Sequence, residues 1–175
     1  VLLGDDSPRG FNTDYSGFIA AYRQQRNKRL PGCVGMVGTG GVGRAVAFGL
    51  LTSGAREIRL VDQQREKSER LADDLRKADA DCAISVAETL EGCDGLVNCT
   101  PVGMVGYPGT PVPAEHMRGA QWAFDAVYTP VETEFLAHAA SAGIEIISGY
   151  ELFFWQGIDA WRIFSGLTVD KAALR

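Results

Sequence analysis

The chain has 175 residues, which fits one domain with at most a small appendage, and its composition is that of an ordinary globular protein. Its 17 basic and 22 acidic residues leave a net charge of −5 without a basic stripe, which argues against a nucleic-acid partner. No apolar run approaches the ~18 residues of a membrane span, and no signal peptide opens the chain, so we expect a cytoplasmic protein without membrane contact.

Segments of helical periodicity alternate along the chain with short apolar segments. Helices are predicted at residues 14–27, 44–53, 64–78, 132–142 and 150–164. Strands are predicted at residues 33–37, 57–61, 83–86, 95–99, 122–127 and 144–147. The first helix ends in a basic turn that includes Arg26, and the third turns Leu71, Leu75 and Ala78 inward. Strands separated by helices of this length predict βαβ units, and therefore an α/β fold with a parallel sheet.

A glycine-rich loop, Gly38-Thr39-Gly40-Gly41-Val42-Gly43, stands between the first of these strands and the helix that follows. It satisfies G-x-G-x-x-G, in which Gly38 permits the tight turn, Gly40 lets the backbone approach a pyrophosphate, and Gly43 allows close packing of helix on strand. The start of the helix then offers free N–H groups to the phosphates. The pattern predicts a Rossmann-type doubly wound parallel sheet with flanking helices; the alternative is a plain glycine-rich turn.

Asp62 follows the second strand, where a carboxylate accepts hydrogen bonds from the hydroxyls of an adenosine ribose and repels a 2′-phosphate. NAD is therefore favoured over NADP, although Arg65 and Lys67 lie nearby in sequence and weaken that preference, which leaves NADP as the second cofactor. The alternative for Asp62 is an ordinary helix N-cap.

Metal and disulfide chemistry are not indicated. The four cysteines, Cys33, Cys82, Cys93 and Cys99, form no C-x-x-C pair, and only His116 and His138 offer imidazole ligands. We expect reduced, mostly buried thiols and no metal site, and we assign His138 no role.

Four further segments carry more information than the glycine loop. They are Gly10-Phe11-Asn12-Thr13-Asp14, Asn98-Cys99-Thr100-Pro101-Val102-Gly103-Met104, Asp125-Ala126-Val127-Tyr128-Thr129-Pro130, and Gly149 followed seven residues later by Gln156. Together with the glycine loop, in this order and at suitable spacing, they resemble the shikimate/quinate dehydrogenase family over nearly the whole chain, from about Gly10 to Gly166.

The resemblance implies an NAD(P)-dependent, reversible oxidation of a ring hydroxyl of a cyclitol carboxylate, shikimate to 3-dehydroshikimate or quinate to 3-dehydroquinate. Asp14 matches the family's catalytic Asp and also touches the substrate, as do Tyr128 and Gln156. The residues expected to bind the cofactor are Gly38, Thr39, Gly40, Gly41, Val42, Gly43, Asp62, Gln63, Arg65, Asn98, Thr100, Met104, Ala126 and Gly149.

Each of the three substrate residues also has a plainer interpretation. Asp14 is explained equally well as the N-cap of its helix. Tyr128 fits a packing residue at a strand end. Gln156 lies in a helix rich in Phe and Trp, which is more often a core element than a binding site.

The chain departs from the family's pattern in two ways at its sites. Leu152-Phe153, preceded by Glu151, stands where the family typically has a Met-Leu pair, so the apolar wall near the nicotinamide is reshaped. Asp62-Gln63-Gln64 stands where many members carry the Asn-Arg-Thr segment that binds the phosphate of NADP, which agrees with NAD as the cofactor.

The largest departure concerns domains. We expect residues 1–13 to be an entry segment from an amino-terminal substrate domain that the chain lacks, residues 14–166 to form the NAD-binding domain, and residues 167–175 to be a tail. The family's catalytic lysine belongs to that missing domain. None of the chain's lysines lies where it should be: Lys28, Lys67, Lys77 and Lys171.

Two other functions compete with a dehydrogenase, and both retain the nucleotide fold. The first is a stand-alone nicotinamide-nucleotide-binding module without catalysis. The second is another Rossmann enzyme such as a methyltransferase, against which the motifs of Tyr128 and Gln156 argue. For a dehydrogenase, we expect a small cyclitol carboxylate as the partner molecule and a monomer or homodimer as the assembly.

Overall fold

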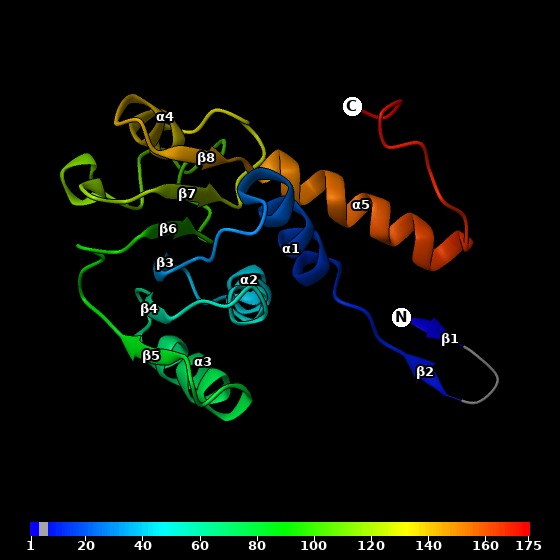
Figure 1. Cartoon of the computed structure of the whole chain (residues 1–175), viewed down its shortest axis with the longest axis horizontal. Coiled ribbons are helices and arrows are strands. Elements are labelled where there is room, and N and C mark those ends of the chain that lie inside the picture. The colour runs from blue at the N-terminus through cyan, green and yellow to red at the C-terminus, as the bar shows by residue number, and fades with distance from the viewer. Residues whose placement is uncertain (4–6) are drawn as a thin grey trace.

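A six-stranded parallel sheet forms the centre of the computed structural model, which describes residues 1–3 and 7–175 (Figure 1). The strand order is β5-β4-β3-β6-β7-β8. The strands are β3 (Cys33–Val37), β4 (Glu57–Val61), β5 (Ala83–Val86), β6 (Gly95–Asn98), β7 (Trp122–Asp125) and β8 (Glu145–Ile147). Every neighbouring pair is parallel, so the α/β prediction with a doubly wound parallel sheet is confirmed.

Helices cover both faces of this sheet. They are α1 (Thr13–Arg26), α2 (Gly41–Thr52), α3 (Arg65–Ala78), the short 3-10 helix η1 (Ala114–Met117), α4 (Glu134–Ser141) and α5 (Gly149–Ser165). An antiparallel pair, β1 (Leu2–Leu3) with β2 (Pro8–Arg9), and the outer half of α5 both project away from the sheet (Figure 1). Among the described residues, no helix is long and apolar enough to cross a membrane.

The predicted helices and strands are all present, with ends that move by at most a few residues. The largest shift is at α2, which begins at Gly41 because the glycine loop itself supplies its first turn. One residue that was predicted to face the core does not do so. Ala78 is exposed at the end of α3, whereas Ser68 and Ala72 face the core together with Leu71 and Leu75.

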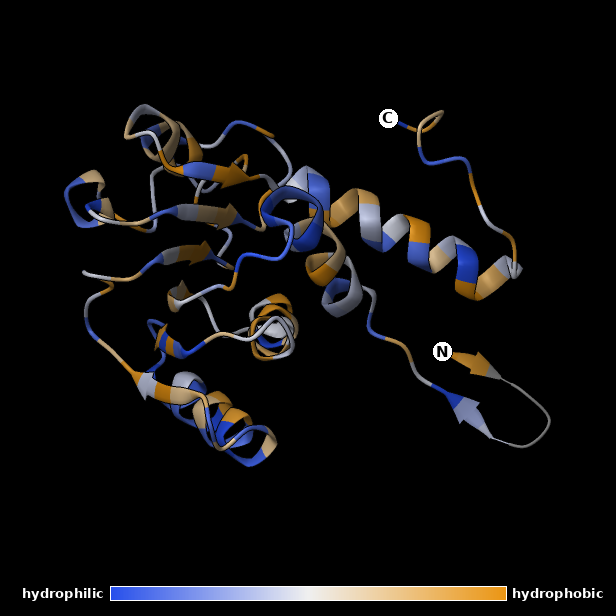
Figure 2. Ribbon diagram, viewed as in Figure 1, coloured by the Kyte–Doolittle hydropathy of each residue, from blue (hydrophilic) through white to orange (hydrophobic). Residues whose placement is uncertain are grey.

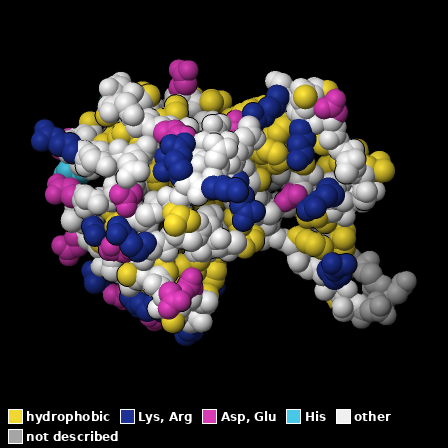
Figure 3. All heavy atoms as spheres, in the orientation of Figure 1, with side chains coloured by type: hydrophobic (Ala, Val, Ile, Leu, Met, Phe, Trp, Pro, Cys, Tyr) yellow, Lys and Arg dark blue, Asp and Glu magenta, His cyan; other side chains and the backbone are white. Residues whose placement is uncertain are grey.

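Each face of the sheet has its own hydrophobic core, because successive strand residues point to opposite faces. The larger core joins the sheet to α1, α2 and α3, with Phe18 edge-on to Phe124 and Tyr22 edge-on to Trp122. The smaller core lies between the sheet, α4 and η1. Figure 2 shows hydrophobic residues in the central strands and also along α5, and Figure 3 shows hydrophobic side chains at the surface there. Among the exposed residues of α5 are Phe153, near its start, and Trp161 and Phe164 in its outer half.

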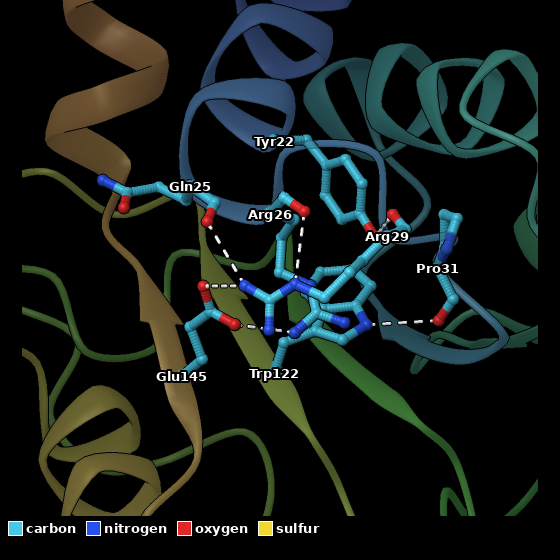
Figure 4. A network of polar contacts seen from close by, with 7 residues as sticks. All are labelled: Tyr22, Gln25, Arg26, Arg29, Pro31, Trp122 and Glu145. Atoms are coloured by element: carbon cyan, nitrogen blue, oxygen red, sulfur yellow. Dashed lines mark hydrogen bonds and ion pairs between the residues drawn. The ribbon is translucent and has the colours of Figure 1, made fainter.

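The carboxyl end of α1 is fastened to β8 by a polar network that the sequence did not predict (Figure 4). Arg26 was expected at a basic helix end, but it is buried, 2% exposed, and its Nη1 donates to Glu145 Oε2 at 2.7 Å. Arg29 Nη2 donates to the other carboxylate oxygen, also at 2.7 Å. The Arg26 guanidinium lies 5.8 Å from the ring centre of Trp122, and the Trp122 indole N–H donates to Pro31 O.

Glu145→Ala should destabilise the fold by about 2 kcal/mol, because it leaves the buried Arg26 guanidinium without its anion. Urea unfolding followed by circular dichroism measures the change. The control is Glu69→Ala, which removes an exposed partner of Arg65 on α3 and should cost no more than about 0.5 kcal/mol. Equal losses in the two variants would contradict the role given to Arg26.

Candidate functional site

The strand order reverses at β3, which has β4 on one side and β6 on the other. The loops that follow β3 and β6 therefore diverge at the carboxyl edge of the sheet, where open α/β folds bind ligands. A cleft of ≈ 720 Å³ opens there, and we call it the main cleft. The lining residues used below are Gly38, Gly40, Asp62, Gln63, Lys67 and Thr100.

The glycine loop forms one wall of the main cleft, and its glycines are needed for two different reasons. Gly38 has φ +93°, and a Cβ on it would come within 2.7 Å of the Cys99 carbonyl carbon. A Cβ on Gly43 would lie 2.1 Å from Gly38 O, so this position needs glycine for the close approach of α2 to β3. Gly40 and Gly41 have nothing within 4 Å of such a Cβ, so the loop is open on that side.

The amino terminus of α2 is uncapped. Its N-cap residue is Gly40, which supplies no side-chain hydrogen bond, so the first-turn N–H groups of the helix keep no side-chain acceptor at this cap. These groups, with the positive end of the helix dipole, favour an anion such as a phosphate at this wall of the cleft.

Asp62 lines the main cleft beside the glycine loop, which holds its carboxylate. Its Oδ2 accepts from Thr39 N at 2.8 Å and from Thr39 Oγ1 at 2.9 Å, while its Oδ1 accepts from Gln64 N at 2.9 Å. Partial burial by itself raises the pKa of Asp62, but these hydrogen bonds and the charge of Lys67 outweigh it and hold the pKa below its usual value. Asp62 is therefore an anion at neutral pH. The N-cap interpretation was wrong, because the N-cap of α3 is Gln64.

Arg65 and Lys67, the two basic residues predicted to lie near Asp62, occupy different places in the structure. Arg65 pairs with Glu69 on the exposed side of α3, with 2.9 Å between Nε and Oε1, and is not among the residues that line the main cleft. Lys67 does line the cleft. Gln63, which was also predicted, lies at the same wall.

A smaller cleft of ≈ 260 Å³ continues from the main cleft, with Cys99, Thr100 and Pro101 common to both. We call it the side cleft. Four residues predicted from sequence line it besides Thr100: Val42, Met104, Ala126 and Tyr128. The two clefts form one continuous groove along the carboxyl edge of β4, β3, β6 and β7.

Asn98 was expected to contact a ligand, but its side chain is buried and engaged within the protein. Its Nδ2 donates to Val102 O at 3.0 Å and to Asp125 Oδ1 at 2.9 Å. Its Oδ1 accepts from Thr100 N at 2.9 Å and from Thr100 Oγ1 at 2.7 Å. Asn98 therefore shapes the loop that follows β6.

Asp125, at the end of β7, is the most important site residue to which sequence reasoning assigned no role. It is fully buried, and its carboxylate accepts from Asn98 Nδ2, from Val127 N at 3.0 Å and from Thr133 Oγ1 at 2.6 Å. Burial raises the pKa of Asp125 to about 6, against the pull of these hydrogen bonds. The loop bearing Ala126 and Tyr128 is thus anchored at its first residue. The signal in the sequence was a carboxylate closing an apolar strand.

Asp14 and Gln156 lie on α1 and α5, two helices that pack against each other. The two helices approach closely at Gly17, where a Cβ would lie 2.9 Å from the Gln156 backbone nitrogen. Burial raises the pKa of Cys99, which lines both clefts, and the charges of Asp125 and Asp14 add to that effect. The N-cap interpretation of Asp14 was wrong, because Asn12 Oδ1 is the cap and accepts from Tyr15 N at 3.0 Å.

Gly149 opens α5 against the loop after β7, the loop that also carries Tyr128. A Cβ on Gly149 would lie 2.2 Å from Val127 O, so glycine is needed there for α5 to begin against the loop after β7. Tyr128 lies just after β7 and is 53% exposed, so its ring is packed on one side and open to solvent on the other. Its ring stacks on Phe153 of α5 at 5.1 Å and 20°.

The remaining titratable groups of the described residues form no metal site. Within residues 1–3 and 7–175, no three His, Cys, Asp or Glu side chains gather as metal ligands. All four cysteines are free thiols, and Cys33, Cys82 and Cys93 are buried. His138 lies on α4 with Glu134 at 4.0 Å, away from the groove.

Comparisons with known proteins find similarity to nicotinamide-dependent dehydrogenases. A family model described as NADP oxidoreductase, coenzyme F420-dependent, matches residues 33–106. The shikimate dehydrogenase (NADP(+)) of Pseudarthrobacter chlorophenolicus is 37% identical over an alignment that takes in 100% of this chain and 62% of that protein. The quinate/shikimate dehydrogenase (NAD(+)) of Corynebacterium efficiens is 34% identical over 100% of this chain and 64% of that protein. The chain is homologous to the shikimate/quinate dehydrogenases.

Solved structures agree with this assignment. The quinate dehydrogenase of Corynebacterium glutamicum in complex with NAD superposes with a TM-score of 0.86, at 37% identity, over 94% of this chain and 61% of that one. The shikimate 5-dehydrogenase of Thermus thermophilus in complex with NADP(H) and shikimate gives a TM-score of 0.82, at 32% identity, over 94% and 60%. The Rossmann-type prediction is therefore confirmed. The chain spans less than two thirds of the length of each of these relatives.

The buried carboxyl of Asp125 should make stability depend on pH. Its pKa is about 6 in the folded protein and near 3.8 when exposed, so the folded state binds one more proton between these values. That proton's contribution is fully present below pH ~4 and is lost as the pH rises through about 6. The wild type should therefore lose stability relative to Asp125→Asn by about 1.4 kcal/mol per pH unit across the middle of this range.

Urea unfolding of both proteins at pH values from 4.5 to 6.5 measures the difference. Asp81→Asn, which makes the same change of charge at an exposed position, is the control and should track the wild type across the range. A stability difference between Asp125→Asn and wild type that stays constant with pH would show that Asp125 titrates at its ordinary value.

Proposed function

We propose that the chain binds a nicotinamide adenine dinucleotide along the groove, with the adenosine half in the main cleft and the nicotinamide half in the side cleft. The observation that carries this proposal is that the ionised Asp62 and the glycine loop that leads into the uncapped start of α2 line the same cleft. Free N–H groups for phosphates and, further along the chain, a carboxylate for ribose hydroxyls are the two features that dinucleotide binding needs.

The described residues fit such a cofactor. Gly40 leaves the loop open where a pyrophosphate approaches the backbone, and Asp62 retains acceptor capacity on Oδ1. Met104, Ala126 and Val42 give the side cleft an apolar wall of the kind that a nicotinamide ring packs against. The ionised Asp62 disfavours a 2′-phosphate, and Lys67 in the same cleft offsets part of that effect, so NAD is the preferred cofactor and NADP the second.

We propose further that the parent reaction is the reversible oxidation of a ring hydroxyl of a cyclitol carboxylate. When bound, the nicotinamide ring accepts the hydride. Asp14 accepts a hydrogen bond from the hydroxyl that is oxidised and so favours loss of its proton. Tyr128 and Gln156, one at the side cleft and one on α5 facing α1, hold the substrate's polar groups in one orientation. The homologues named for shikimate and quinate support this substrate class.

The other candidate function is a nicotinamide-nucleotide-binding module without catalysis. Among the described residues, no lysine lines the side cleft: Lys67 lies in the main cleft and Lys171 lies over the Trp155 ring. The coding sequence upstream of Val1 separates the two functions. About 100 residues of αβ pattern containing a suitably placed lysine would support the enzyme.

Asp62→Ala should reverse the choice of cofactor. The wild-type chain should bind NAD more tightly than NADP, and the variant should bind NAD several-fold less tightly while gaining affinity for NADP, because the repulsive carboxylate is gone. Calorimetric titration with each dinucleotide measures both affinities. Glu66→Ala removes a neighbouring acid outside the cleft lining and is the control. An unchanged preference in Asp62→Ala would refute the ribose role.

The 175-residue chain should bind NAD and yet turn over little or no shikimate or quinate, because no cationic partner for Asp14 is found among the described residues that line the side cleft. Absorbance of the reduced nicotinamide, followed with each substrate at pH values from 7 to 9, measures turnover. Measurable oxidation of either substrate by this chain would show that its own residues suffice for catalysis.

A further inference from the structure

Thr39 makes contacts that the glycine-loop pattern does not require. The second position of G-x-G-x-x-G has no side-chain role in the motif. Here the side chain is almost buried, 8% exposed, and its hydroxyl donates to Asp62 Oδ2 at 2.9 Å beside the backbone N–H of the same residue at 2.8 Å. Thr39, which stands between the lining residues Gly38 and Gly40, thus forms one hydrogen-bonded unit with Asp62 at the edge of the main cleft.

The two oxygens of the Asp62 carboxylate differ in how many acceptor positions they have left for a ligand. A carboxylate offers about four acceptor positions, two on each oxygen. Both positions on Asp62 Oδ2 are taken by Thr39, and one on Oδ1 is taken by Gln64 N, so one position remains on Oδ1. A ribose presents two neighbouring hydroxyl donors. Asp62 in this arrangement accepts only one of them.

The Thr39 hydroxyl supplies the second acceptor. It donates its own proton to Asp62, which leaves its two lone pairs available and makes the oxygen a better acceptor, because its proton is drawn toward an anion. We propose that Thr39 Oγ1 and Asp62 Oδ1 together recognise the ribose diol, each accepting from one hydroxyl. This inference rests on the proposed function, since it assumes an adenosine ribose in the main cleft.

The positions of Thr39 and Asp62 along the fold indicate which ribose hydroxyl donates to each of them. Thr39 belongs to the loop that leads into the amino terminus of α2, where the phosphates lie, while Asp62 Oδ1 faces the start of α3 at Gln64. In a ribose, the 3′ carbon adjoins the carbon that carries the 5′ phosphate arm, and the 2′ carbon adjoins the carbon that carries the base. The 3′-hydroxyl therefore donates to Thr39 and the 2′-hydroxyl to Asp62.

Nucleotides that lack one hydroxyl test this assignment without any catalytic step. ADP, 2′-deoxy-ADP and 3′-deoxy-ADP are titrated by calorimetry into wild type, Thr39→Val and Thr39→Ser. Wild type should lose about three- to ten-fold in affinity when the 3′-hydroxyl is missing, the effect of one hydrogen bond. Thr39→Val should bind ADP more weakly by a similar factor and bind 3′-deoxy-ADP as well as it binds ADP. Thr39→Ser, which keeps the hydroxyl, should behave as wild type.

The possible results separate this inference from the proposed function. If Thr39→Val weakens ADP and 3′-deoxy-ADP by the same factor, Thr39 only orients Asp62 and the inference is overturned. If Thr39→Val binds ADP more weakly than wild type but binds 2′-deoxy-ADP as tightly as wild type, the assignment of hydroxyls is overturned. If no nucleotide binds wild type, the proposed function is wrong, and the inference, which depends on it, is wrong as well. Thermal unfolding of each variant establishes that it is folded before titration.

Discussion

The hydrogen bond from Asn98 to Asp125 is the interaction on which the groove depends. It joins the ends of β6 and β7, which are adjacent parallel strands in register, at the point where both chains leave the sheet. Asn98 then holds Thr100 and Val102 of one loop, and Asp125 holds Val127 and Thr133 of the other. Both walls of the side cleft are therefore set by two buried polar side chains whose hydrogen bonds are satisfied within the protein.

Asp62 and Asp125 show how position along one sheet edge gives two carboxyl groups opposite properties. Both follow a strand, and both accept three hydrogen bonds. Asp62 is only partly buried, and the hydrogen bonds from Gln64 and Thr39, with the charge of Lys67, outweigh that burial and lower its pKa, so it remains an anion at the main cleft. Asp125 is enclosed by protein, and the cost of burying its charge raises its pKa to about 6. Asp62 is therefore suited to binding a ligand, and Asp125 to holding the loop after β7 in place.

Much of the fold was predictable from sequence, because apolar strands and helices alternate at a regular spacing and glycine and proline mark their ends. The glycine loop and Asp62 were predictable as well, since their roles follow from local backbone chemistry. The burial of Arg26 was not, because it depends on Glu145 and Trp122, which are distant in sequence. The same holds for the exposed Ala78 and for the internal hydrogen bonds of Asn98, which follow from tertiary packing.

The close pairing of α1 with the last elements of the chain has a consequence for the order of folding. Phe18 and Tyr22 reach their partners Phe124 and Trp122, and Arg26 reaches Glu145, only after roughly 100 further residues have been synthesised. Until β7, β8 and α5 are made, α1 presents aromatic side chains and a cation to water. Helix α1 is thus made well before the elements against which it packs, and its contacts, having long sequence separation, belong to the slow part of folding.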